Sequence, residues 1–109
     1  MQLIDRAGLF TPPGDAPNHY VEQFRVPDLS VGTYSIPAGG VDDQTPHSED
    51  EIYVVCRGRA RLVAGDAAVD VEPGSVVHVP AGEPHRFVDV LEDLALLVVF
   101  APAYRSRAG

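Results

Sequence analysis

Turn-forming residues recur at short intervals along this chain, with short runs of β-branched and other apolar residues between them. The turn signals are Pro12-Pro13-Gly14, Pro27-Asp28, Gly39-Gly40, Arg57-Gly58, Gly65-Asp66, Pro73-Gly74, Ala81-Gly82 and Glu92-Asp93. Glycine and proline, with ten residues each, interrupt the sequence before an uninterrupted helical period can develop. The pattern therefore predicts an all-β fold built from short strands.

The predicted strands are residues 20–26, 30–36, 52–56, 60–64, 67–71, 75–79, 85–90 and 94–101. Residues 3–9 are expected to form a short helix or a turn. From Glu51 to Cys56, alternate positions on both faces of the strand are largely apolar. A strand covered on one side only would alternate apolar with polar residues. This strand therefore favours a homodimer contact or a second packed sheet on its outer face.

The length of 109 residues fits a single domain, residues 1–109, with residues 1–18 as an N-terminal arm. The chain carries eight arginines, no lysine and 16 acidic residues, for a net charge of -8. Such a surface repels phosphate backbones and anionic membranes, so neither nucleic acid nor membrane is an expected partner. The arginine, alanine, glycine and valine usage without lysine hints at a bacterial source.

Cys56 is the only cysteine, which excludes an internal disulfide and fits a reducing compartment. The first residues carry an acid and an arginine early and contain no apolar run of signal-peptide length. The longest apolar stretch, residues 94–101, is too short to span a bilayer. We therefore expect a cytoplasmic protein.

Two blocks of the sequence combine turn residues with potential metal ligands. The first block contains Gly39, His47, Glu51 and Gly58, and the second contains Gly74, Pro80, Gly82, His85 and Asp89. Each block places a potential ligand beside a turn at the end of a strand. The mouth of a barrel is where side chains from several strands can meet around one point.

The two blocks resemble the motifs of the cupin superfamily, G-x5-H-x-H-x3,4-E-x6-G and G-x5-P-x-G-x2-H-x3-N. The chain departs from them at Thr45, where the family has its first histidine, and at Asp89, where asparagine is usual. The resemblance implies a cupin-type double-stranded β-helix, or jelly-roll barrel, with a motif-bearing core at residues 39–89. An alternative register would make His47 the first histidine and Glu49 the second, but it would put Val41 in place of the leading glycine.

In the preferred register, the resemblance implies a metal site formed by His47, Glu51 and His85. Two imidazoles and a carboxylate suit a divalent transition metal such as Fe, Mn, Ni or Zn, and three ligands leave positions open for water and substrate. Glu49, or Thr45 through a water, would complete the coordination. Tyr53 shares a face with Glu51, and we expect Tyr53 or Glu49 to position substrate or to carry a proton.

The cupin resemblance allows several functions. The first hypothesis is a metal-dependent enzyme acting on a small organic molecule, of the dioxygenase, isomerase, cyclase or lyase type. The alternative is a non-enzymatic module that binds a small, sugar-like molecule, and a metal-free epimerase or structural barrel is a third reading. The fold does not choose among these, and the sequence identifies neither substrate, metal nor reaction.

Overall fold

The computed structural model describes residues 1–108 and is all-β, as predicted. Its strands are β1 (His19–Val26), β2 (Leu29–Ile36), β3 (Asp50–Arg57), β4 (Ala60–Ala64), β5 (Ala67–Val71), β6 (Val76–Val79), β7 (Arg86–Val88) and β8 (Leu94–Ala101). All eight match the predicted segments to within two residues at either end. The largest overestimate is at β7, which ends at Val88 because Asp89 adopts a positive φ of 50° that ends the extended backbone.

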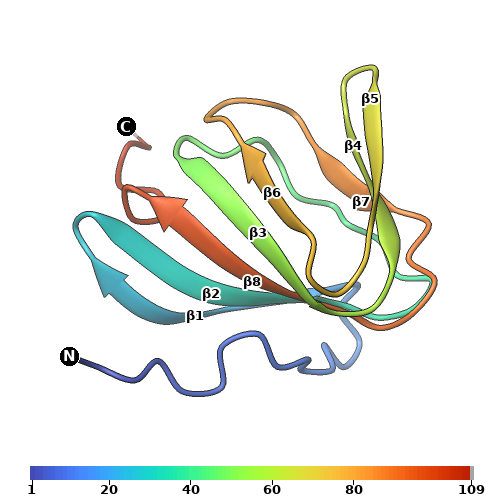
Figure 1. Ribbon diagram of the computed structural model, residues 1–109, viewed down its shortest axis with the longest axis horizontal. Coiled ribbons are helices and arrows are strands. Elements are labelled where there is room, and N and C mark those ends of the chain that lie inside the picture. The colour runs from blue at the N-terminus through green and yellow to red at the C-terminus, as the bar shows by residue number, and fades with distance from the viewer. Residues whose placement is uncertain (109) are drawn as a thin grey trace.

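The strands form two antiparallel sheets, which Figure 1 shows as the two walls of an open barrel. The larger sheet has the order β1-β2-β8-β3-β6, and the smaller has the order β5-β4-β7. The core between them draws on both sheets, with Leu62 and Phe87 from the smaller facing Leu96 and Val98 from the larger. The central position of β3 and β8 explains their strongly apolar sequences.

Strand β3 shows how the barrel uses the two faces of its strands. Glu51, Tyr53 and Val55 are buried and point inward, whereas Ile52 and Val54 on the outer face are half-buried. The inward face thus carries both the core tyrosine and the carboxylate of the predicted metal site. The sequence was right that both faces are apolar, and the outer face is the more exposed of the two.

Part of the outer face of the larger sheet is covered by the N-terminal arm, which runs beneath β1 and β2 in Figure 1. The amide of Gly8 donates to Thr33 Oγ1 at 2.8 Å, and the amide of Thr11 donates to Ser35 Oγ at 3.0 Å. The region predicted as a short helix or turn is a turn at residues 5–8. Within residues 1–108 there is no helix long and apolar enough to cross a membrane.

The loop between β2 and β3 carries His47 and Glu49 of the predicted site, and Asp42 connects it to both sheets. The Asp42 carboxylate accepts a hydrogen bond from Tyr34 Oη on β2 at 2.6 Å and another from the Phe87 amide on β7 at 2.8 Å. Asp42 is only 5% exposed. Because these partners belong to opposite walls of the barrel, the loop is held across the barrel mouth.

Candidate metal centre

The structure brings His47, Glu51 and His85 together at one end of the barrel. One ligand atom from each residue lies within 4.8 Å of those from the other two. Glu51 projects inward from β3, His47 lies in the loop before it, and His85 immediately precedes β7. The three residues predicted from motif spacing therefore form one cluster.

A single carboxylate oxygen, Glu51 Oε1, lies between the two imidazoles. It is 3.1 Å from His85 Nε2 and 3.8 Å from His47 Nε2. Glu51 is 2% exposed, and no hydrogen bond reaches its Oε1 from any residue between 1 and 108. A buried carboxylate oxygen favours a positive charge beside it, which a protonated His85 or a divalent cation would supply.

The surroundings act on the two histidines in opposite directions. Burial lowers the pKa of His47, which favours the neutral imidazole that a metal requires. Burial also opposes the charged form of His85, but the nearby Glu51 carboxylate and the Glu83 carbonyl outweigh it and raise the pKa of His85. His85 Nδ1 lies 2.8 Å from that carbonyl, which can only accept, so Nδ1 carries a proton and Nε2 faces the cluster.

Tyr53 lies directly against the cluster, as its position on β3 predicts. Its hydroxyl is 3.0 Å from His85 Nε2, and its side chain is fully buried. Burial raises the pKa of Tyr53 well above its usual value, so the phenol keeps its proton. The hydroxyl also donates to Gln44 Oε1 at 3.0 Å. Gln44 was missed from the sequence, although it stands next to Thr45 in the first motif.

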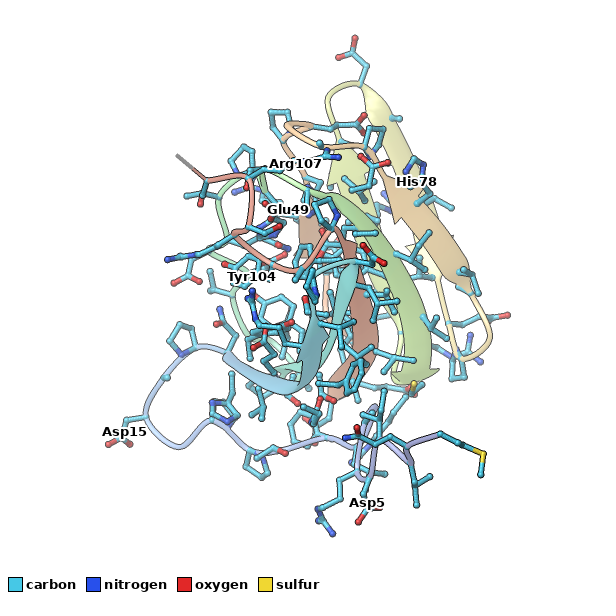
Figure 2. The ribbon with its side chains drawn as sticks, turned by 90° about the vertical axis from the view of Figure 1, so that its left-hand side faces the viewer. Asp5, Asp15, Glu49, His78, Tyr104 and Arg107 are labelled. Atoms are coloured by element: carbon cyan, nitrogen blue, oxygen red, sulfur yellow. The ribbon has the colours of Figure 1, made fainter. Side chains whose placement is uncertain are left out.

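Glu49 is buried, but its carboxylate is engaged elsewhere. It accepts hydrogen bonds from Ser48 Oγ at 2.5 Å and from the amides of Arg105 and Arg107 at 2.8 and 2.9 Å. Figure 2 shows Glu49 beside the C-terminal segment that carries Arg107. Burial would raise the pKa of Glu49, but these hydrogen bonds outweigh it and lower the pKa. These contacts favour an anchoring role for Glu49, and its part in proton transfer stays a prediction.

The other two histidines do not belong to the cluster, and Thr45 is exposed. His78 is paired with Asp50 at 3.2 Å on the exposed side of β6, and Figure 2 shows it away from Glu49 and Tyr104. His19 begins β1 and is not a member of the cluster. Thr45, which stands where the cupin motif has a histidine, is exposed.

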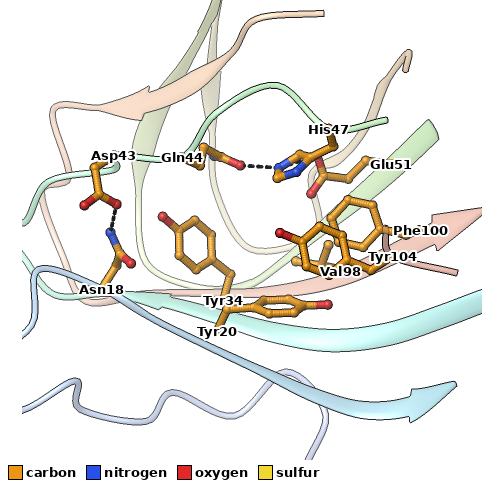
Figure 3. A pocket seen from close by; sticks show the side chains of 10 residues that line it. All are labelled: Asn18, Tyr20, Tyr34, Asp43, Gln44, His47, Glu51, Val98, Phe100 and Tyr104. Atoms are coloured by element: carbon orange, nitrogen blue, oxygen red, sulfur yellow. Dashed lines mark hydrogen bonds and ion pairs between the residues drawn. The ribbon is translucent and has the colours of Figure 1, made fainter. Parts of the chain in front are cut away.

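A cavity of about 180 Å³ adjoins His47 and Glu51. Figure 3 shows its walls, and the side chains that line it are Asn18, Tyr20, Tyr34, Asp43, Gln44, His47, Glu51, Val98, Phe100 and Tyr104. Tyr104 stacks on Phe100 with ring centroids 4.6 Å apart, and the His47 ring meets Phe100 edge-on at 5.0 Å. The three tyrosines of this wall were not predicted from the sequence, because they come from β1, β2 and the C-terminal segment.

A second polar atom in the cavity wall, besides Glu51 Oε1, lacks a hydrogen-bond partner. Tyr20 Oη is buried, and it forms no hydrogen bond with any of residues 1–108. Burial raises the pKa of Tyr20, so its phenol stays protonated. The cavity thus combines an apolar aromatic wall with one free hydroxyl and, at its inner end, the His–Glu cluster.

The cupin domain family matches residues 32–100 of the chain. An uncharacterised protein of Streptomyces coelicolor is 47% identical over 83 residues, which cover 76% of this chain and 79% of that protein. This protein is therefore a member of the cupin family, and the resemblance of its two motifs is confirmed.

Solved structures show the same fold. A double-stranded β-helix protein from Klebsiella pneumoniae has a TM-score of 0.77 at 16% identity, covering 94% of this chain and 89% of that one. The DMSP lyase DddQ from Ruegeria pomeroyi has a TM-score of 0.73 at 21% identity, covering 93% of this chain and 54% of the lyase. At these identities the likeness establishes the cupin double-stranded β-helix and leaves the chemistry open.

Proposed function

We propose that this cupin is a metal-dependent enzyme that acts on a small organic molecule held in the aromatic cavity. The observation that carries the proposal is the buried Glu51 Oε1, which lies between two imidazoles without a hydrogen bond. A divalent cation would satisfy that oxygen and would use the Nε2 atoms of His47 and His85. The residues present therefore fit a metal such as Fe, Mn, Ni or Zn.

A bound divalent ion would supply Lewis acidity toward a substrate oxygen, and iron would add chemistry with O2. The residues of the chain would bind the substrate, exclude water and hold a proton. Phe100 and Tyr104 form an apolar wall that excludes water and packs against the substrate. Tyr53 would hold a proton beside His85 Nε2, and Tyr20 Oη would offer a hydrogen bond to a polar group of the substrate.

The volume of the cavity limits the size of the substrate. Its volume of about 180 Å³ lies below the range of roughly 300–1,000 Å³ that is typical of pockets for drug-sized ligands. A compact molecule with an apolar body and one or two oxygens fits this space. Dioxygenase, isomerase, cyclase and lyase chemistry all remain candidates, and the fold shared with the lyase DddQ is compatible with the last of them. The net charge of -8 supports a small-molecule partner over nucleic acid or a membrane.

The metal site is tested by elemental analysis of protein purified without added metal and then loaded with one divalent ion. We expect about one ion per chain in the wild type and almost none in a His47→Ala/His85→Ala variant. A His19→Ala/His78→Ala variant is the matched control, because both of its histidines lie outside the cluster. Equal metal content in the wild type and the first variant would contradict the proposal.

A non-enzymatic module that binds a sugar-like molecule is the second candidate, and the aromatic wall favours it. Rings such as Tyr104 and Phe100 pack well against the apolar faces of a sugar. In this case, binding of the molecule would persist after chelation and in a Glu51→Ala variant. Loss of binding under both conditions would favour the enzyme instead.

A further inference from the structure

Gln44 places a side-chain oxygen at the edge of the metal cluster. Its Oε1 lies 2.8 Å from His47 Nε2, and Figure 3 marks this contact. The position is next to Thr45, where the family motif has a histidine and this chain has an exposed hydroxyl. The motif histidine is missing at Thr45, and the side-chain amide of the neighbouring residue, Gln44, reaches the cluster instead.

Asp42 determines which end of the amide faces the cluster. Gln44 Nε2 donates to Asp42 Oδ2 at 2.6 Å. A carboxylate only accepts hydrogen bonds, so the amide nitrogen must face Asp42 and the carbonyl oxygen must face His47. Asp42 cannot turn away easily, because Tyr34 Oη and the Phe87 amide also hold it. The orientation of Gln44 is thus imposed by the buried carboxylate.

The oxygen also has a chemical reason to meet a cation. Gln44 Oε1 lies 2.8 Å from His47 Nε2, the nitrogen that would bind the metal. Glu51 Oε1 lies 3.8 Å from the same nitrogen. Gln44 Oε1 and Glu51 Oε1 both lie near His47 Nε2, so a cation held by that nitrogen would have both oxygens within reach. Carbonyl oxygens are ligands for divalent ions such as Mn2+.

We propose that Gln44 Oε1 is a fourth metal ligand, which replaces the motif histidine absent at Thr45, and that Asp42 orients it. The inference rests on the proposed metal site at His47, Glu51 and His85 and extends it to a four-residue set. It applies to the bound state, since the metal takes the place of the hydrogen bond between His47 and Gln44. Tyr53 Oη continues to donate to the amide oxygen and holds it in line.

The test uses Co2+ as the probe, with affinity from calorimetry and coordination from the visible absorption of the bound ion. A Gln44→Ala variant should bind Co2+ about 10–100-fold more weakly, as expected when a group that shapes a metal site is lost. Its absorption bands should shift because the coordination changes. Gln2→Ala is the matched control, because Gln2 is exposed in the N-terminal arm, and it should leave both the affinity and the spectrum unchanged.

A second variant tests the orientation. Asp42→Asn can present an amide to Gln44 and remove the charge that fixes its nitrogen, so the Co2+ affinity should fall while circular dichroism still reports a folded β protein. The inference is wrong if Gln44→Ala binds Co2+ at least as tightly as the wild type and with the same spectrum. Gln44 would then only hydrogen-bond to His47, and the proposed metal site at His47, Glu51 and His85 would stand. If the wild type binds no Co2+, the proposed site fails and the inference fails with it.

Discussion

Glu49 and Glu51 lie two positions apart, are both buried and have entirely different partners. Glu51 points into the cluster with an unpartnered oxygen, whereas Glu49 accepts backbone amides from the C-terminal segment. The amide of Tyr104 is held as well, by Ser30 Oγ at 2.9 Å. Glu49 therefore fixes the segment whose ring, Tyr104, closes one side of the cavity.

Replacing Glu49 by alanine should lower the free energy of unfolding by about 1–3 kcal/mol, because two backbone amides lose their partly buried hydrogen bonds to a charged acceptor. Urea denaturation measures the change. Glu49→Gln should lose less, since its carbonyl oxygen still accepts one of the amides. Metal content should stay at the wild-type level in both variants. A loss of metal would instead support the register in which Glu49 stands in for a motif histidine.

At the scale of the strand, β1 and β2 form the aromatic wall because a ring on β1 packs closely against a glycine on β2. The ring of Tyr20 lies over Gly32, and a Cβ built on Gly32 would be 2.2 Å from Tyr20 Oη and 2.4 Å from its Cζ. The ring is not free to move aside, because it meets Tyr34, Phe100 and Tyr104 edge-on. Glycine at this position is therefore what allows Tyr20 to line the cavity.

A Gly32→Ala variant should lose about 1–3 kcal/mol of stability, the usual cost of forcing extra volume into a packed site. The same substitution in a Tyr20→Ala background should cost much less, because the obstructing ring is gone. Thermal or urea unfolding of the four proteins gives the coupling energy. Additive effects of the two substitutions would contradict this account of the wall.

For the whole molecule, the outer face of the larger sheet is the surface to explain. Val76, Val54 and Leu97 are cross-strand neighbours on β6, β3 and β8, and Val76 is 62% exposed. The N-terminal arm reaches the end of this row, where Gly8 lies against Cys56 and beside Leu97. The exposed Val76 and the half-buried Val54 beside it favour a subunit contact, and we propose that the protein is a homodimer through this face.

Light scattering coupled to gel filtration should report a mass of twice 11.7 kDa. A Val54→Arg/Val76→Arg variant should shift the mass to that of one chain, because buried unpaired charges oppose the contact. Val69→Arg is the control, since Val69 is 48% exposed on the smaller sheet. A single-chain mass for the wild type would contradict the proposed dimer.

The sequence by itself determined the strands, their boundaries and the cluster of His47, Glu51 and His85. Turn residues and β-branched runs act locally, and the family spacing places the two motifs at the barrel mouth. The end of β7 was overestimated by two residues, because the positive φ at Asp89 cannot be inferred from its residue type.

The tertiary structure alone decided what surrounds the cluster. Glu49 and its partner Arg105 are 56 positions apart, so no local pattern could pair them. The orientation of Gln44 depends on a carboxylate that is itself held by both walls of the barrel. Long-range hydrogen bonds, burial and side-chain direction are established only when the two sheets close. Motif spacing therefore located the ligands, whereas their surroundings depend on the folded structure.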